Sequence, residues 1–266
     1  MGKARIFNIC LSATLVASLL VSCNSEKLDD FVVNSITAQD GTVVDINSIA
    51  VAPKEDFEYV ISDSKVMITS YIGTAQDVSI PSEIDDTPVT ALLSDVFYAD
   101  EDLRAVVIPE GVTTIKDSAF YDCSSLIYVG LPSTLTEMGE NIFANCVSLE
   151  SLVLPNRVTE VPNRCFYGCT SLSSVTMGSS VKKIGDYAFA SCNAIYGMTI
   201  SSSITHIGDF AFFQCVDLNV IEFTGQTSFE KTSFLQCDSL VVYTLKGSVP
   251  YSLANEYGLT VAVKNQ

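Results

Sequence analysis

The sequence predicts a solenoid of stacked 23-residue coils, mostly β with short helical turns, closed at its C-terminal end by a short capping helix. The first observation is a phenylalanine that returns every 23 residues, with one last step of 22: Phe97, Phe120, Phe143, Phe166, Phe189, Phe212 and Phe234. The second is a cysteine three residues after each of these from Phe120 on: Cys123, Cys146, Cys169, Cys192, Cys215 and Cys237. The third is an aliphatic residue three positions beyond each cysteine: Leu126, Leu149, Leu172, Ile195, Leu218 and Leu240. A fixed period of roughly 20–50 residues is the signature of repeat proteins, in which stacked coils bury a continuous core.

The chain opens with a segment typical of export signals. Lys3 and Arg5 precede an apolar stretch that ends at Val21 and is too short to cross a bilayer stably. The end of this stretch, Leu20-Val21, is followed by Ser22 and Cys23. The four residues L-V-S-C match the lipobox pattern of bacterial lipoproteins. We therefore expect residues 1–22 to be a lipoprotein signal peptide and Cys23 to be the site of lipidation. An ordinary signal peptide with a chance cysteine is the alternative.

Residues 23–56 are expected to form a tether with an N-terminal hairpin. The acidic run at residues 26–30 resembles the export tag of surface lipoproteins in the Bacteroidetes; a solvated acidic tether is the alternative. Farther on, Asp40-Gly41 separates two runs that contain apolar residues, which is a hairpin signal. Because the end coils of a solenoid must be covered, we expect this hairpin to pack on the first coil as a cap.

Residues 57–245 are expected to form the coils, beginning with an opening coil. In one unit, Leu126, Val129 and Leu131 form the inward face of a short strand, which Pro132 ends because proline has no N–H for the ladder. Two apolar positions three residues apart start the return side of each coil: Val112 and Ile115, Leu135 and Met138, Val158 and Val161, Val181 and Ile184, Ile204 and Ile207. The phenylalanine then closes the coil. Stacking at about 4.8 Å per coil puts these rings in one buried row.

The strands also predict an outward stripe, because residues that flank an inward side chain point to the other face. The flanking pairs are Ala105 and Val107, Tyr128 and Gly130, Ser151 and Val153, Ser174 and Thr176, Gly197 and Thr199, Val220 and Glu222, and Val242 and Thr244. From these we select the candidate binding residues Val107, Tyr128, Ser151, Val153, Ser174, Thr176, Thr199, Val220 and Glu222. Small, β-branched and almost uncharged, they suit a protein edge or loop. A glycan ranks second because only Tyr128, with Tyr196 nearby, offers an aromatic platform; good strand formers without a ligand are the remaining alternative.

The cysteines are interpreted as structural. Six occupy one repeat position, so their side chains point inward in a row, where cysteine acts as a small buried hydrophobe and weak donor. Disulfides or a metal site are the alternatives. Parallel Cβ vectors within a row suit a disulfide badly, and Cys165 and Cys169 lack a second pair with metal-ligand spacing.

Residues 246–266 are expected to cap the C-terminal end. Ser248 can cap a short helix that stops at Gly258, since serine favours the N-cap and glycine the position after the last helical residue. The run from Leu259 to Val263 would then be a last strand.

The repeat resembles the BspA-type (Treponema-type) leucine-rich repeat. The resemblance rests on L-x-x-V-x-L-P, V-T-x-I-x-x-x-A-F and F-x-x-C-x-x-L, seen for example between Val112 and Cys123, and extends from about residue 57 to residue 266. Gly178, Ser201 and Thr224 replace the proline in later repeats. The resemblance implies a leucine-rich-repeat solenoid and a surface or secreted protein with a binding role, since several members are adhesins.

Charge and motifs narrow the function further. The formal net charge is −17, and cleavage before Cys23 would leave 12 basic and 31 acidic residues, a net charge of −19. A chain this acidic repels nucleic acid and anionic lipid headgroups. It has no Gly-rich phosphate loop, no G-x-S-x-G and no metal-spaced His/Asp set, and its single histidine, His206, occupies a variable and exposed repeat position. We expect no enzyme, no cofactor and no metal.

These observations predict a lipid-anchored outer-membrane protein, exposed on the bacterial surface, that binds a protein partner in adhesion or in contact with host cells. The membrane is expected to be contacted through the lipid anchor only. The alternatives are a glycan-capturing surface lipoprotein and a periplasmic accessory subunit.

Overall fold

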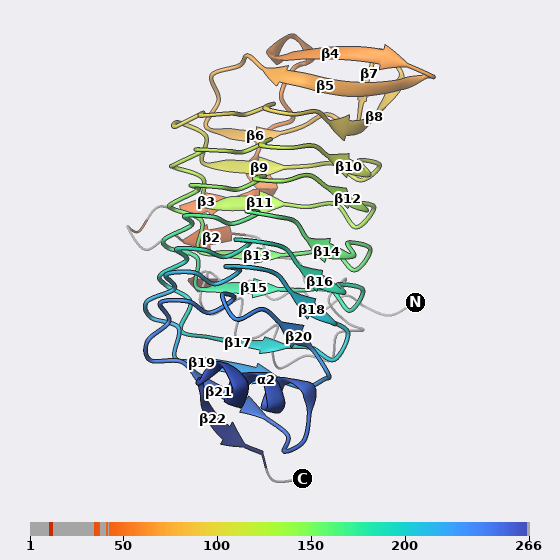
Figure 1. Ribbon diagram of the computed structural model, residues 1–266. Helices are drawn as coiled ribbons and strands as arrows, with labels where there is room; N and C mark the ends of the chain where they lie inside the picture. Colours follow the sequence, from red (N-terminus) through yellow and green to blue (C-terminus); the bar gives the residue numbers. More distant parts are fainter. Residues whose placement is uncertain (1–10, 13–34, 38–40, 42, 265–266) are drawn as a thin grey trace, which may run out of the picture.

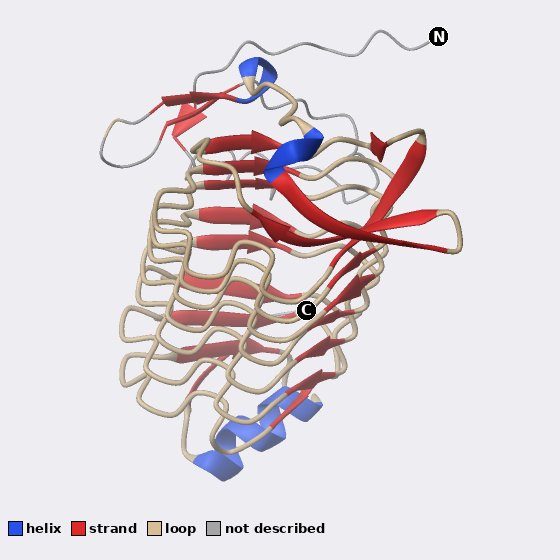
Figure 2. Ribbon diagram, turned by 90° about the horizontal axis from the view of Figure 1, so that it is seen from above, coloured by secondary structure: helices blue, strands red, loops and turns tan. Residues whose placement is uncertain are grey.

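The computed structural model describes residues 11–12, 35–37, 41 and 43–264. Residues 57–264 form a β-solenoid whose cross-section has three sides, two built of parallel strands and one built of turns (Figure 2). Each coil except the last two contributes one strand to each ladder, and successive coils stack along a single axis (Figure 1). The solenoid predicted from the phenylalanine period is therefore confirmed.

The first ladder contains the strands that follow the repeated cysteines. Its strands are β6 (Asp77–Ser79), β9 (Ala105–Val107), β11 (Tyr128–Gly130), β13 (Ser151–Val153), β15 (Ser174–Thr176), β17 (Gly197–Ile200), β19 (Val220–Phe223), β21 (Val241–Thr244) and β22 (Thr260–Val263). They pair in parallel within the groups β6–β9–β11, β13–β15 and β17–β19–β21–β22. Tyr128 lies opposite Ala105, so neighbouring strands are in register one repeat apart.

The second ladder is the return side of the coils. Its strands are β8 (Thr87–Leu92), β10 (Thr114–Ile115), β12 (Glu137–Met138), β14 (Glu160–Val161), β16 (Lys183–Ile184), β18 (His206–Ile207) and β20 (Ser228–Phe229). The second residue of each short strand is buried, as its predicted inward position requires. These strands are only two residues long from β10 on because the chain must turn again to reach the phenylalanine.

The third side consists of tight turns around the phenylalanines. These turns are not helical, unlike the short helical turns that the sequence predicts. In the coil of Phe120, the N–H of Tyr121 donates to the carbonyl of Ser118 at 3.0 Å, and Ser118 and Asp122 have positive φ values of 58° and 59°. The N–H of Phe120 itself donates to the carbonyl of Ile142 in the next coil at 2.9 Å. The turns are thus tied both within a coil and between coils, which satisfies their backbone groups without a helix.

A column of phenylalanine rings fills the core. From Phe97 to Phe234 successive rings stack with centroids 5.1–5.6 Å apart and interplanar angles of 10–16°. Each cysteine of the row donates its S–H to the carbonyl of the phenylalanine one coil earlier; Cys169 Sγ lies 3.0 Å from the oxygen of Phe143. The same oxygen accepts the N–H of Cys146 at 3.1 Å. A small side chain with one donor therefore fits this position better than a larger apolar one.

Both ends of the core are covered. At the first coil, β4 (Phe57–Ser62) and β5 (Lys65–Tyr71) form an antiparallel hairpin, β5 pairs with β8, and β7 (Glu83–Ile84) pairs with β8 from the other side. Phe57 and Tyr71 prolong the ring column toward Phe97, with centroids 5.4 and 5.0 Å apart.

At the last coil, helix α2 (Val249–Tyr257) packs against β20, β21 and β22. Ser248 Oγ accepts the N–H of Tyr251 at 3.2 Å, and Gly258 ends the helix in the left-handed region at φ 78°. Strand β22 follows, so the cap has the form that the sequence indicates.

The N-terminal hairpin does not cap the first coil, contrary to the expectation. Strands β2 (Ser35–Thr37) and β3 (Val43–Asp45) are antiparallel, β1 (Leu11–Ser12) pairs with β2, and the turns η2 (Ile46–Ser48) and η3 (Lys54–Asp56) lead to β4. This small sheet lies against the outer face of the first ladder (Figures 1 and 2). The hairpin β4–β5 already occupies the end of the core, whereas the outer face offers an apolar patch.

The contact between hairpin and ladder is apolar and specific. Val44, on β3, is buried together with Ala105 and Ile127, and Ile49 and Tyr128 pack beside them. We call residues 43–53 the strap.

The predicted signal peptide and Cys23 lie outside the described residues, except for the two residues of β1. The predicted division at residues 23–56, 57–245 and 246–266 stays a prediction. Where the structure describes the chain, it contains no helix that is both long and apolar enough to cross a membrane.

Candidate functional site

The first candidate surface is the outer stripe, the outward side chains of the first ladder. All of its predicted binding residues lie on this one face: Val107, Tyr128, Ser151, Val153, Ser174, Thr176, Thr199, Val220 and Glu222. Ladder pairing places Ser151 opposite Ser174 and Thr199 opposite Glu222, so the stripe is continuous from coil to coil within each group of strands. Val153 and Thr199 are exposed, and the others are half-buried. Alternation along the strands, read from the sequence, was sufficient to place them.

The strap covers the outer stripe at the end nearest the first coils, on β9 and β11. Ala105 points outward as expected, yet its side chain is fully buried because Val44 lies over it. Tyr128 is shielded by the same contact, and this burial raises the pKa of its hydroxyl. The open part of the stripe therefore begins at β13.

One predicted pair of the outer stripe is wrong. Val242 and Thr244 were expected to point outward, but both side chains lie inside the coil. Ladder pairing places Val241 opposite Val220 and Tyr243 opposite Glu222, so these two residues continue the stripe. The phenylalanine step of 22 aligned Val242 with Val220, but the ladder partners are 21 residues apart, because a further residue is missing between Leu240 and Val242. A shift of one residue in a strand exchanges its two faces.

The open stripe is electrically neutral. Glu222, its charged residue, is ion-paired with Lys264 and accepts a hydrogen bond from Thr199 Oγ1 at 3.5 Å. The hydroxyl of Ser174 is buried and has no hydrogen-bond partner within the described part of the chain. An unpaired buried hydroxyl is costly, and because this one is covered it is not itself available to a partner on the stripe.

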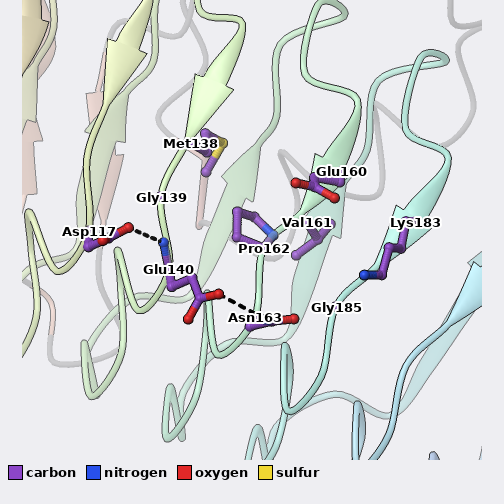
Figure 3. Close-up of a pocket in the computed structure, with 10 residues that line it drawn as sticks. All are labelled: Asp117, Met138, Gly139, Glu140, Glu160, Val161, Pro162, Asn163, Lys183 and Gly185. Atoms are coloured by element: carbon purple, nitrogen blue, oxygen red, sulfur yellow. Dashed lines mark hydrogen bonds between the residues drawn. The ribbon is translucent and has the colours of Figure 1, made fainter.

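A small hollow lies where the second ladder meets the turns (Figure 3). Its walls include Asp117, Glu140, Glu160, Asn163 and Lys183, and its volume is about 130 Å³. Asp117 Oδ1 accepts the N–H of Glu140 at 2.8 Å, and Asn163 Nδ2 donates to Glu140 Oε1 at 2.9 Å. These polar groups hold neighbouring coils together. The hollow is well below the roughly 300–1,000 Å³ of small-molecule sites, so it does not suit a metabolite.

Among the described residues, the histidine and the cysteines are held in structural contacts. His206 is half-buried, more than its variable position suggested, and its Nδ1 lies 3.0 Å from Ser228 Oγ. The seven cysteines from Cys123 to Cys237 are free and buried. Burial raises the pKa of Cys123 to about 12 and that of Cys237 to about 11, so both thiols stay protonated near neutral pH and are poor nucleophiles.

The described residues also contain no group of His, Cys, Asp or Glu side chains that could hold a metal ion. The acidic pair at Asp85 and Asp86 is explained locally. Asp85 binds Lys54 Nζ at 2.5 Å, and this hydrogen bond lowers the pKa of its carboxyl.

The second candidate surface, which the sequence reasoning missed, lies on the side formed by the turns. Its aromatic side chains are Tyr98, Tyr121, Tyr167, Tyr187, Phe210 and Phe213, and we call this set the aromatic belt. Four of them directly follow a repeated phenylalanine, and two precede one by two residues. This regular offset from the repeated phenylalanine is the sequence pattern that indicates the belt, whereas the strands predict only Tyr128 and Tyr196 as aromatic platforms.

The chain is similar to a known repeat family and to several solved structures. A family profile described as BspA type leucine rich repeat region matches six copies, over residues 90–196 and 159–254. A solved leucine rich repeat protein of T. pallidum (TpLRR) is similar at 27% identity and a TM-score of 0.69, covering 82% of this chain and 100% of that chain.

A leucine rich cell surface protein from Faecalibacterium prausnitzii shows 16% identity and a TM-score of 0.43, covering 82% of this chain and 96% of that one. A leucine-rich repeat protein from Bacteroides capillosus shows 24% identity and a TM-score of 0.41, covering 47% and 96%. The comparison with curated proteins gave no match.

Proposed function

Because the chain belongs to the BspA-type leucine-rich-repeat family, whose members are typically surface or extracellular interaction scaffolds, we propose that it is a lipid-anchored bacterial surface protein that binds a protein partner. The proposed role is adhesion or contact with host cells. The proposed binding surface is the open outer stripe, from β13 to β21.

The shape and charge of the open stripe support a protein partner. Its strands present small and β-branched side chains in register, including Val153, Thr176, Thr199 and Val220. Its carboxylate, Glu222, is already neutralised by Lys264. A flat surface of this kind can pack against another polypeptide without desolvating an unpaired charge. This is the observation that carries the proposal.

The outer stripe does not favour the glycan alternative. Tyr128, the platform expected on its strands, is shielded by the strap. Tyr196, beside the stripe, is 66% exposed but stacks on no other ring in the described part of the chain. Tyr243, on β21, is 39% exposed and also stacks on no other ring in the described residues, so the stripe offers a sugar two separate aromatic side chains and no stacked platform.

The proposed anchor is a lipid on Cys23, and the proposed location of the solenoid is the outer surface of the outer membrane. The lipobox and the acidic residues 26–30 support this location. Two or three acyl chains hold a protein on a membrane stably, whereas a single chain does not. Protease treatment of intact cells tests the location: loss of the protein supports surface exposure, and full protection would favour a periplasmic accessory subunit.

A matched pair of variants tests the binding surface. Thr199→Arg adds a long charged side chain to the open stripe, and Thr159→Arg adds the same group at an exposed position outside it. A protein captured by the wild type should be lost with Thr199→Arg and kept with Thr159→Arg. Equal capture by both variants, or selective binding to a glycan array that Thr199→Arg abolishes, would contradict the proposal.

A further inference from the structure

We infer that the aromatic belt docks a proline-rich segment in the polyproline II conformation, with a basic residue of that segment beside Tyr98. The belt lies on the turn side of the solenoid and the outer stripe on the first ladder, so this second binding surface does not depend on the stripe.

The belt is not needed to complete the core. The buried phenylalanine column and its cysteines already fill the interior, and the belt side chains project on the outside of the same turns. Tyr98 is 53% exposed and Tyr167 is 39% exposed. Exposed aromatic groups in one continuous region mark interaction surfaces more often than isolated ones do.

Some rings of the aromatic belt stack on one another, but not all of them do. Tyr98 and Tyr121 stack with centroids 5.2 Å apart, and Tyr187 and Phe210 stack at 4.9 Å. Phe213 meets Phe210 edge to face at 5.8 Å. Tyr167 stacks on no other ring in the described residues and remains accessible to a ligand.

The spacing of the belt identifies the conformation of the ligand. At the position after the repeated phenylalanine, Tyr98 and Tyr121 lie in adjacent coils. From Tyr121 on, an aromatic group recurs every second coil, at Tyr167 and Phe213, with Ala144 and Ala190 between them. Two coils span about 9.6 Å, because neighbouring strands lie about 4.8 Å apart. A polyproline II helix repeats every three residues at ~3.1 Å each, or about 9.3 Å. Prolines three residues apart would therefore meet successive aromatic groups of the belt.

Charge complementarity identifies the end of the ligand that carries the cation. Around the Tyr98 end of the belt lie five carboxylates: Asp95, Asp100, Glu101, Asp102 and Asp122. None of them forms an ion pair with another described residue. Farther along, Arg164 lies over the ring of Tyr187 at 5.2 Å, so a cation of the protein itself already occupies that ring face. Next to Tyr98, a lysine or arginine of the ligand is attracted by the carboxylates and can also stack on the ring face. A neutral glycan is not attracted by the carboxylates.

The test measures binding of the full-length protein to an array of peptides of the form R-x-x-P-x-x-P and P-x-x-P-x-x-R, beside matched arrays with alanine in place of proline. We expect binding that requires both prolines and the arginine, because aromatic surfaces read the pre-formed polyproline II helix. Tyr167→Ala should weaken the best peptide about tenfold, as an aromatic anchor does. Tyr196→Ala removes an exposed tyrosine outside the belt and should leave the affinity unchanged.

Two further variants make the outcome decisive. Tyr167→Phe keeps the ring and should bind as the wild type does, and Glu101→Gln should reduce the preference for arginine over alanine at the basic position. Equal binding of the alanine arrays, no peptide binding at all, or wild-type affinity in Tyr167→Ala would overturn the inference. A glycan that binds the wild type and is lost in Tyr167→Ala, without peptide binding, would assign the belt to sugars and overturn it as well. Loss of peptide binding in Tyr167→Ala with partner capture on the outer stripe intact separates the two surfaces.

Discussion

At the scale of single residues, the core depends on a phenylalanine and a cysteine that serve each other. Each ring stacks on the rings of the coils before and after it, and the cysteine of the following coil donates its S–H to the phenylalanine carbonyl. The carbonyl has two lone pairs, and the N–H of its own coil's cysteine uses the other. Cysteine is retained at this position because it is small, apolar and a donor, not because it reacts.

The stability lost when a phenylalanine of the ring column is removed should depend on the position of that phenylalanine along the stack. Phe166 is fully buried between Phe143 and Phe189, with centroids 5.6 and 5.2 Å away. We expect Phe166→Ala to lower the free energy of unfolding by about 3–5 kcal/mol. Phe234→Ala, in the last coil, should cost less because terminal coils open more readily. Urea denaturation of both variants measures this, and two small, equal losses would show that the rings are not a buried column.

The buried thiols should make the protein sensitive to alkali. Burial raises the pKa of Cys123 from 9.0 to about 12, so the unfolded chain loses this proton before the folded protein does. The stabilisation from this group is therefore fully present below about pH 9 and is lost as the pH rises from 9 towards 12.

Urea midpoints between pH 8 and pH 11 measure the effect, and Cys123→Ala should flatten the alkaline fall. Tyr71 and Tyr128, whose pKa values burial also raises, add the same loss to both proteins, so the comparison isolates the thiol. Identical pH profiles would mean that the thiol of Cys123 is accessible to water in the folded state.

At the scale of elements, the N-terminal hairpin β2–β3 and the strap that begins with β3 do not lie where the sequence predicts. Terminal hairpins commonly cover the open end of a solenoid, but here β4–β5 takes that place and β2–β3 lies across the outer face. Its contact with the ladder centres on Val44, Ala105 and Ile127. The strap thereby limits where a partner can bind on the outer stripe.

The strap should be separable from the solenoid. Val44 is 2% exposed and Val43 is 53% exposed, so they form a matched pair. We expect Val44→Asp to release residues 43–53 to limited proteolysis, because a carboxylate cannot be buried against Ala105 and Ile127 without a large cost. The melting temperature should change little, since the ring column is untouched. Val43→Asp should leave the strap protected, and unfolding of the whole protein by Val44→Asp would contradict a peripheral strap.

At the scale of the whole molecule, the solenoid presents two different long faces. The outer stripe is flat, neutral and partly covered by the strap, whereas the aromatic belt is exposed at Tyr98 and Tyr167 and is bordered at one end by carboxylates that form no ion pair with another described residue. A protein built of repeats can hold two such surfaces at once because every coil contributes a side chain to each face.

Attachment to the membrane should depend on one side chain. Cys23→Ala removes the thiol that would accept the lipid, and we expect the protein to leave the membrane fraction, because the acyl chains supply nearly all of the membrane affinity. Ser25→Ala, two residues on, should leave attachment intact. Fractionation with a salt wash checks both variants. Retention of the Cys23→Ala protein after the wash would rule out the lipid anchor.

The fixed period alone was enough to place the coils, the buried rings, the thiol row and most of the outer stripe, because it puts equivalent residues at equivalent positions in a stack. The prediction was wrong at Val242 and Thr244, where the strand step is 21 residues and not the 22 of the phenylalanines, a difference that exchanges the two faces of the strand. The position of the strap and the aromatic belt were decided only by the tertiary structure. Both depend on which segments meet across the surface: Val44 reaches Ala105 over a long stretch of chain, and Phe210 meets Phe213 only once the turn is formed. Periodicity describes what repeats: it gives the belt residues their common positions, but it does not tell which side chains stay exposed, and it does not describe the contact of Val44 with Ala105, which joins residues outside the repeat.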